Sequence, residues 1–154
     1  MVYGTPYHVG VEEDWEDIVA EKVGAVIGGH DWLDVEGVIF DYKHFVSGSI
    51  IPHGRATALL RENLWNYIWS SDGYQPDADV ILRAHVHYHQ SASDGKKLGV
   101  ILPSLQGYGS KYGVRRQSGQ INIGLVYFDC EKGQYNWNLS LFESDILSIA
   151  PKKA

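Results

Sequence analysis

The chain has 154 residues, of which 44% are hydrophobic and 21% charged, so it is long and apolar enough for one globular domain. Its net charge of −6 argues against a nucleic-acid-binding protein with a basic surface, although a metal site can bind phosphate without one. Cys130 is the single cysteine, which excludes an intramolecular disulfide and a cysteine-based zinc site. The sequence has no apolar run of about 20 residues and no secretory signal, so we expect a cytoplasmic protein without membrane contact.

The first elements are a loop and a helix within a single predicted domain, which we place at residues 1–150 with a frayed tail at 151–154. A loop containing glycine and proline near the amino terminus presents His8. Apolar residues recur at helical spacing over residues 11–23, acidic residues crowd the first turns, and Gly24 follows. These signals predict an amphipathic helix that ends at the glycine.

Two extended segments are predicted next, at residues 25–27 and 38–42. The glycine-rich connection between them carries His30, Asp31 and Asp34. An imidazole and carboxylates this close together suit a metal site, and the same residues suit a turn. Both interpretations of the connection remain open.

A second helix is predicted from Gly54 to about Trp69, after a loop at residues 47–53. Backbone donors at the start of a helix favour an anion, so Arg55 and His53 are candidate contacts for a phosphate group. Helical spacing also predicts which residues pack on the core: Ala56 or Leu60, and Ala58, Leu59, Leu64, Trp65, Ile68 and Trp69.

Histidines follow two of the predicted strands. The apolar run at residues 80–84 leads into His85, His87 and His89, and the earlier strand leads into His44 after one lysine. In an extended chain, residues two apart share a face about 7 Å apart, so these imidazoles are placed to flank one metal ion or a pair. If the two strands are parallel neighbours, His44 and His85 meet at the edge where α/β sheets bind ligands.

The rest of the chain has the pattern of antiparallel strands. An Asp-Gly turn precedes a strand at residues 98–102, and residues 130–133 predict a turn between strands at 120–128 and 134–142. We expect the loop at residues 103–118 to form one wall of a pocket. The order of elements predicts a layered α/β domain whose later part is a β-sheet layer.

Residues 76–87 read Pro-Asp-Ala-Asp-Val-Ile-Leu-Arg-Ala-His-Val-His. This stretch resembles the late Gly-His-x-His motif of the calcineurin-like metallophosphoesterases, with Ala84 in place of the motif glycine. The strand ending in His44 resembles an earlier family motif, and residues 4–8 stand where the family has Gly-Asn-His. The resemblance implies a layered α/β/β/α sandwich that hydrolyses phosphate esters, as a phosphatase or a phosphodiesterase.

Carried over by position, the resemblance implies that His44 and His85 bind one divalent metal ion and that His87 binds a second. Manganese, iron, zinc or nickel would suit such ligands. The resemblance also implies that His8 meets the leaving group or the phosphoryl oxygens. The implied partner is a phosphate-ester substrate, and a nucleic acid is a partner only in that role.

The family's Asp-x-His and Gly-Asp-x-x-Asp motifs, which supply further ligands and a bridging carboxylate, are absent from the chain. We therefore expect the carboxyl-terminal half of the family domain, from a truncated or split gene, without the amino-terminal β-α-β half. Such a chain is expected to bind one metal ion or none and to be weak or inactive alone. An open sheet edge favours pairing with a complementary amino-terminal half or with another copy.

Two other interpretations remain. In one, the chain is a non-catalytic metal-binding or interaction module that keeps the scaffold and some histidines. In the other, it is a structural β-rich domain with incidental histidines. Tight binding of a single ion without hydrolysis favours the module, whereas a melting temperature that no metal changes favours the structural domain.

Overall fold

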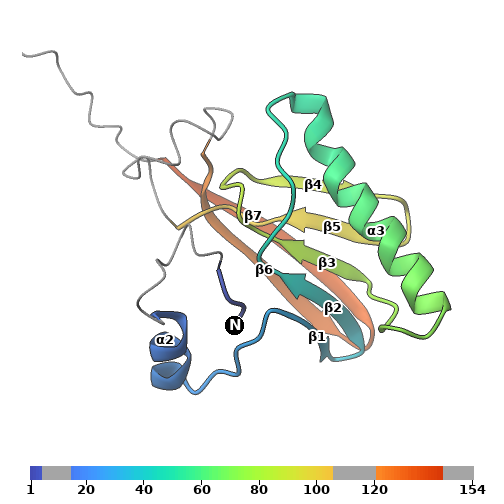
Figure 1. The fold of residues 1–154 in the computed structure, drawn as a ribbon, viewed down its shortest axis with the longest axis horizontal. Coiled ribbons are helices and arrows are strands. Elements are labelled where there is room, and N and C mark those ends of the chain that lie inside the picture. Colours follow the sequence, from blue (N-terminus) through green and yellow to red (C-terminus); the bar gives the residue numbers. More distant parts are fainter. Residues whose placement is uncertain (5–14, 106–120, 144–154) are drawn as a thin grey trace, which may run out of the picture.

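The computed structural model describes residues 1–4, 15–105 and 121–143 and shows a mixed α/β fold (Figure 1). A five-stranded sheet, in the order β1-β2-β3-β5-β4, lies between helix α3 on one face and the two-stranded sheet β6-β7 on the other. The predicted α/β class is confirmed, and three of the predicted layers lie within the described residues. The elements are α2 (Trp15–Val23), β1 (His30–Val35), β2 (Val38–Lys43), the 3-10 helix η1 (Pro52–Gly54), α3 (Arg55–Ser71), β3 (Val80–Arg83), β4 (Gln90–Ser93), β5 (Leu98–Ile101), β6 (Ile123–Glu131) and β7 (Gln134–Phe142).

The middle of the five-stranded sheet is parallel, and its two edges are antiparallel. β3 pairs in parallel with β2 on one side and with β5 on the other, while β1 and β4 are the antiparallel edge strands. β3 and β5 are almost wholly buried because layers cover both faces of the sheet, which suits their apolar, β-branched residues. The carboxyl ends of β2 and β3 therefore reach the same edge of the sheet.

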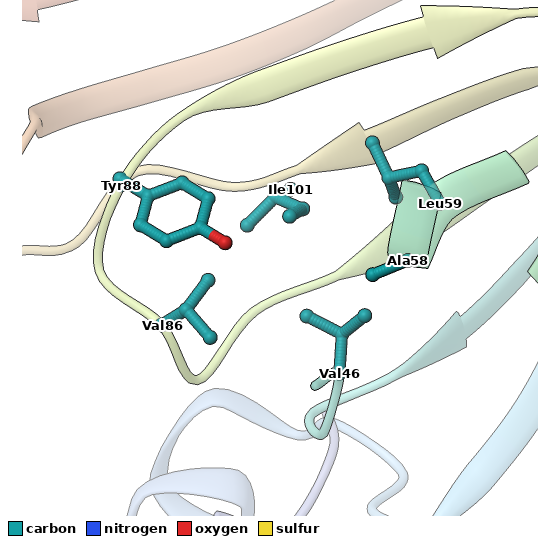
Figure 2. Packing of buried hydrophobic residues seen from close by; sticks show 6 residues of the cluster. All are labelled: Val46, Ala58, Leu59, Val86, Tyr88 and Ile101. Carbon is teal, nitrogen blue, oxygen red and sulfur yellow. The ribbon is translucent and has the colours of Figure 1, made fainter. Parts of the chain in front are cut away.

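One hydrophobic core lies between the sheet and α3. It contains Val46, Ala58, Leu59, Val86, Tyr88 and Ile101 (Figure 2). Gly99 allows the close approach of the helix, because a Cβ atom there would lie 3.1 Å from the Cβ of Leu59. Val86 and Tyr88 reach this core from the segment that follows β3, so the core anchors the stretch that carries the histidines.

A second core joins the two sheets. Val38, Phe40 and Val80 form its buried centre, and Phe128 and Tyr135 of the β6-β7 sheet pack against it. The rings of Phe40 and Phe128 meet edge to face, with centroids 5.0 Å apart. Because a two-stranded sheet is marginally stable alone, this packing is what stabilises β6 and β7.

The structure corrects three predicted strand boundaries. The stretch His30–Val35, predicted as a glycine-rich connection, is edge strand β1, and a tight turn of Glu36 and Gly37 with positive φ joins it to β2. The hydrogen bonds to β2 stabilise this stretch as a strand, although glycines, which disfavour strand, flank it. Residues 25–27, predicted to be extended strand, belong to no strand, and β6 (Ile123–Glu131) starts and ends later than predicted.

Helix α2 ends as predicted but does not bury its apolar side. Gly24 has φ 65°, and the N–H of Ala25 donates to the carbonyl oxygen of Ala20 at 2.8 Å, which closes the last turn. Ala20 is buried, whereas the predicted apolar face is exposed: Trp15, Ile18, Val19 and Val23. Residues 11–14 lie outside the described part. No helix among the described residues has both the length and the apolar character of a membrane span.

Helix α3 has nearly the predicted bounds but turns a different face to the sheet. Ala58 and Leu59 are buried as expected. The other buried positions of the helix are polar: Arg55, Asn63 and Asn66. The remaining large apolar residues predicted to pack on the core are instead exposed: Leu60, Leu64, Trp65, Ile68 and Trp69.

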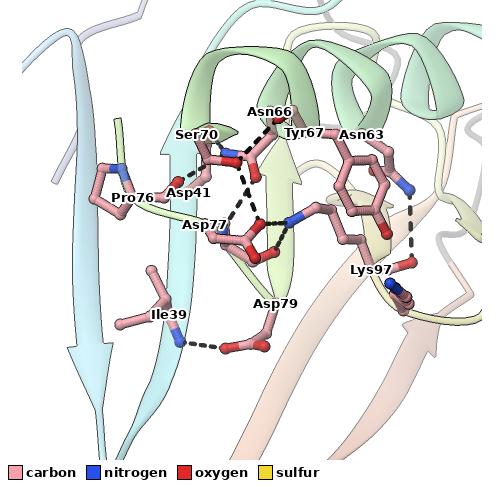
Figure 3. A network of polar contacts seen from close by, with 12 residues as sticks. Ile39, Asp41, Asn63, Asn66, Tyr67, Ser70, Pro76, Asp77, Asp79 and Lys97 are labelled. Carbon is pink, nitrogen blue, oxygen red and sulfur yellow. Dashed lines mark hydrogen bonds and ion pairs between the residues drawn. The ribbon is translucent and has the colours of Figure 1, made fainter. Parts of the chain in front are cut away.

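Polar contacts fix this face of α3 to the chain that leads into β3 (Figure 3). Asn66 Oδ1 accepts from the N–H of Ala78 at 3.1 Å, and Asn66 Nδ2 donates to the carbonyl oxygen of Pro76 at 3.2 Å. The buried Lys97 pairs with Asp77 and donates to the carbonyl oxygen of Ala78. A buried amide group without hydrogen-bond partners costs free energy, so these bonds decide which side of α3 faces the sheet. Their contribution outweighs the free energy that burial of the apolar side of the helix would give.

A buried ion-pair network lies near the carboxyl ends of β2 and β3. Arg83 Nη1 is 2.6 Å from Asp41 Oδ1, and Arg83 Nε is 2.9 Å from Glu62 Oε2. The side chains of Arg83 and Asp41 are only 2% and 1% exposed. Glu62 also pairs with Lys43 at 2.8 Å, and Asp41 with His30 at 2.9 Å. Each charge is held by an opposite charge, so loss of one leaves another buried and uncompensated.

Replacement of the central cation should therefore destabilise the fold. Arg83→Met removes the guanidinium that Asp41 and Glu62 share, and we expect it to lower the free energy of unfolding by about 3 kcal/mol. Lys132→Met is the matched control, because the Lys132–Glu131 pair is 86% and 76% exposed and should contribute less than about 0.5 kcal/mol. Urea unfolding measures both, and equal losses would contradict the role given to the network.

The same network predicts loss of stability in acid. Burial opposes ionisation of Asp41, but the His30 hydrogen bond and the Arg83 guanidinium outweigh it and lower the pKa of Asp41 below 3.8. Glu62 is partly buried, which opposes ionisation, but Lys43 and Arg83 outweigh this and lower the pKa of its carboxyl. Below about pH 5 the unfolded chain binds protons that the folded chain does not. The contribution of these carboxyls to the free energy of unfolding is therefore fully present above that pH and decreases as the solution is acidified.

Asp41→Asn tests this pH dependence. The variant should be less stable at neutral pH and should lose less stability between about pH 5 and pH 3, because one of the responsible carboxyls is gone. Urea unfolding over this pH range gives both quantities. A pH dependence equal to that of the unchanged protein would contradict the assignment.

Candidate metal-binding site

His44 and His85 are brought together by the parallel pairing of β2 with β3. The register that places Phe40 beside Val80 continues past the ends of both strands, since the N–H of Ala84 donates to the carbonyl oxygen of His44 at 2.9 Å. The next residue after this bond is His85. The prediction that the two histidines meet at the carboxyl edge of the sheet is thus confirmed by the geometry.

The two imidazoles lie close together, with their rings nearly perpendicular. His44 Nε2 lies 3.2 Å from His85 Nδ1, and the rings are 5.2 Å apart between centroids at an angle of 76°. One nitrogen can donate its proton to the other, in a hydrogen bond that depends on the tautomers. The separation also fits one metal ion, because two nitrogens each about 2.0–2.1 Å from a tetrahedral zinc lie roughly 3.3 Å apart.

The aromatic ring of Phe45 lies against the imidazole of His85. Its centroid is 5.0 Å from that of His85, and its side chain is about half exposed. Phe45 therefore shields one side of the imidazole from water. No motif in the sequence predicts a role for Phe45, although its position directly after His44 is a usable signal.

The segment that carries the later histidines is not extended as predicted. His85 has φ 75°, and the N–H of Val86 donates to the carbonyl oxygen of Ala84 at 3.0 Å, which forms a three-residue turn around His85. His87 also has a positive φ, 59°. A non-glycine residue in this region costs about 1–3 kcal/mol, and such strain is found most often at functional sites. Buried Val86 and Tyr88 hold the segment in this shape.

Asn122 holds the stretch from His87 to His89. Its backbone N–H donates to the carbonyl oxygen of His87 at 2.9 Å, and its Oδ1 accepts from the backbone N–H of His89 at 2.8 Å. His89 Nδ1 lies 3.0 Å from the carbonyl oxygen of Ile101, and burial lowers the pKa of this imidazole. An asparagine just before a strand gives no functional signal in the sequence, so this contact was missed.

The predicted substrate contacts lie at the start of α3. Arg55 is buried, and its guanidinium carbon lies 4.5 Å from the centroid of the Tyr88 ring. Because Tyr88 directly follows His87, this ring connects Arg55 to the histidine segment. His53 is exposed in η1. His8 lies outside the described residues, as does most of the predicted pocket wall.

The other candidate cluster, at the start of β1, is used for structure. His30 Nε2 lies 2.9 Å from Asp41 Oδ1 in the buried network, and Asp34 Oδ1 accepts from the N–H of Gly37 at 2.8 Å in the turn. Over residues 1–4, 15–105 and 121–143, no three His, Cys, Asp or Glu side chains form a group that would hold a metal ion. The described structure thus joins His44 to His85 and does not bring His87 into a group of three with them.

Comparisons with known proteins add only partial likenesses. No protein-family model matches the chain, and neither does any curated protein. Vps29 from Entamoeba histolytica, solved with zinc, is 15% identical with a TM-score of 0.44, over 76% of this chain and 62% of that one. Thermotoga maritima protein TM1076 is 16% identical with a TM-score of 0.45, over 84% and 74%. Vps29 from Cryptosporidium parvum is 16% identical with a TM-score of 0.40, over 78% and 60%.

This chain thus spans less than two thirds of the length of either Vps29 structure. The α/β class rests on the strand order and layers of the chain itself. The candidate site rests on the contact between His44 and His85.

Zinc should stabilise the folded chain through this pair. At about 1 mM, zinc is expected to raise the melting temperature by a few degrees, because the ion binds the folded state in preference to the unfolded one. His44→Ala and His85→Ala each remove one ligand and should abolish the rise, whereas His53→Ala, in exposed η1, should retain it. Scanning calorimetry measures the shift. A rise that persists when His44 and His85 are both replaced would contradict the site.

Proposed function

We propose that this chain is the carboxyl-terminal part of a metal-dependent phosphoesterase of the calcineurin-like type. The supporting observation is the 3.2 Å separation of His44 Nε2 and His85 Nδ1, at the ends of two adjacent parallel strands. Two separate parts of the chain supply these nitrogens, and His85 has a positive φ, a backbone conformation found most often at functional sites.

In this proposal, His44 and His85 bind one divalent ion, and His87 contributes to a second. Ions of manganese, iron, zinc or nickel bound there would polarise a phosphoryl oxygen and lower the pKa of bound water. The phosphate-ester substrate would enter from the carboxyl edge of the sheet, as ligands do in other open α/β sheets. His8 is the proposed contact for the leaving group.

Arg55 and His53 are the proposed contacts for the phosphate of the substrate. Both lie where the chain enters α3, and the backbone donors of a helix start favour an anion. The contact of Arg55 with the Tyr88 ring would hold the guanidinium in place. A phosphatase and a phosphodiesterase differ only in the second ester group of the substrate, so these contacts serve either reaction.

Two imidazoles are fewer ligands than a closed metal site has, so this chain alone should bind metal weakly and turn over slowly. The remaining ligands would come from a complementary amino-terminal half that carries Asp-x-His and Gly-Asp-x-x-Asp. Such a half would pair with an open edge of a sheet. β1 and β4 are the edge strands of the five-stranded sheet.

The second candidate function is a non-catalytic metal-binding or interaction module. The observation that favours it is that the described residues bring two possible ligands together and not three. Titration calorimetry separates the two functions. Tight binding of one ion per chain, without hydrolysis under any condition of reconstitution, would support the module.

Reconstitution tests the catalytic proposal. With manganese and an upstream polypeptide that carries the two missing motifs, the chain should hydrolyse bis(p-nitrophenyl) phosphate, followed as release of p-nitrophenolate. His85→Ala should lower the rate by about 100-fold or more, because a metal ligand is lost. Lys132→Met, in the exposed β6-β7 turn, should leave the rate unchanged. No turnover by the reconstituted pair, or equal turnover with His85→Ala, would contradict the proposal.

A further inference from the structure

The side of α3 that points away from the sheet is apolar. Its large apolar side chains, which we call the α3 outer face, keep substantial exposed fractions: Leu60 41%, Leu64 55%, Trp65 43%, Ile68 39% and Trp69 44%. Trp65 and Trp69 pack together with ring centroids 5.4 Å apart. Five such residues on one helix form a continuous patch of the kind that marks protein interfaces, where tryptophan is enriched.

The outer face is not needed to hold α3 in the fold. The opposite side of the helix supplies the core contacts through Ala58 and Leu59, and it supplies the polar bonds through Asn66. The helix is therefore already fixed without Leu64, Trp65 or Ile68. Their exposure to water costs free energy that only an additional contact can recover.

Opposite charges stand at the two ends of the outer face. Arg61 is exposed toward the amino end of the helix, and Asp72 is exposed at its carboxyl-terminal cap, about three turns away. The other charge along this stretch, Glu62, is turned inward and pairs with Lys43 and Arg83. Arg61 donates to the hydroxyl of Ser47 at 2.7 Å, and no carboxylate of residues 1–4, 15–105 or 121–143 forms an ion pair with it.

We propose that a second copy of this chain packs on the α3 outer face, with the two helices antiparallel. A two-fold axis near residue 66 would place Leu64 opposite Ile68 of the partner copy and Arg61 opposite Asp72 of the partner copy. Because the interface is isologous, each of these contacts occurs twice. A single sequence thus supplies both the apolar centre and two complementary ion pairs at the rim.

The charges favour a second copy over other occupants. A lipid surface would require basic residues along the polar border of the helix, whereas this face carries one arginine and the chain has a net charge of −6. A partner of a different sequence would not need opposite charges at positions related by a two-fold axis. Two helices of 17 residues, each about 25 Å long, give a contact of useful length.

Sedimentation equilibrium of the full chain tests the proposal. The unchanged protein should form dimers at micromolar concentrations, and Leu64→Ser should shift the equilibrium to monomers. Leu33→Ser is the matched control, because Leu33 is similarly exposed, at 52%, but lies on β1. Circular dichroism checks that each variant is folded. A protein that is monomeric up to about 0.5 mM, or a dimer that Leu64→Ser does not weaken, would overturn the proposal.

Charge exchange tests the antiparallel arrangement. Arg61→Asp and Asp72→Arg should each raise the dissociation constant about tenfold or more, because like charges then face each other twice. The double variant restores opposite charges and should return the constant to within about threefold of the original value. If the double variant were as weak as the two single changes combined, the arrangement would be wrong. A dimer lost through Leu33→Ser instead would assign the contact to the sheet edge and overturn the proposal.

Discussion

The parallel pairing of β2 with β3 is the interaction on which the candidate site depends. It continues one residue beyond each strand through the bond from Ala84 to His44, and this bond sets the two imidazoles side by side. Arg83 and Asp41, which precede the histidines on these two strands, join the strands by a buried ion pair. A change in register would separate the histidines and break the ion pair at once, so the stability of the sheet and the geometry of the site are linked.

The site and helix α3 are connected through one core. Val86 and Tyr88 pack with Ala58 and Leu59 of the helix, and this packing holds the turn around His85 in its unfavourable backbone conformation (Figure 2). The helix is in turn placed by the bonds of Asn66 (Figure 3). Polar contacts therefore decide which face of α3 meets the sheet, and the apolar residues on the other face are left for a contact outside this fold.

Features governed by local pattern were predictable from the sequence. The end of α2 at Gly24 and the start of α3 follow from a helix cap and helical spacing. The approach of His44 to His85 was predictable only on the condition that β2 and β3 pair in parallel, which they do. The buried face of α3 was not predictable, because the spacing of hydrophobic residues does not show that the side-chain amide of Asn66 bonds to two backbone groups. β1 was missed for a similar reason, since its pairing with β2 is a tertiary contact.

The candidate site was predictable only in part. Histidines at every second position suggested an extended strand. The chain instead turns at His85, because Val86 and Tyr88 enter the core. Positive φ at His85 and His87 was not predictable, because few non-glycine residues adopt it and residue type alone does not show where they do. Asn122 lies 33 residues from the backbone group that its side chain accepts from, and no local pattern joins them.

The most direct test of the account is a zinc titration followed by the ¹⁵N chemical shifts of the histidine side chains. One ion shared by the two strand ends should shift His44 Nε2 and His85 Nδ1 together, with the same midpoint, while the ring of His53 stays unchanged. Shifts of the two nitrogens at different midpoints, or of neither nitrogen, would contradict the claim that this pair binds a single metal ion.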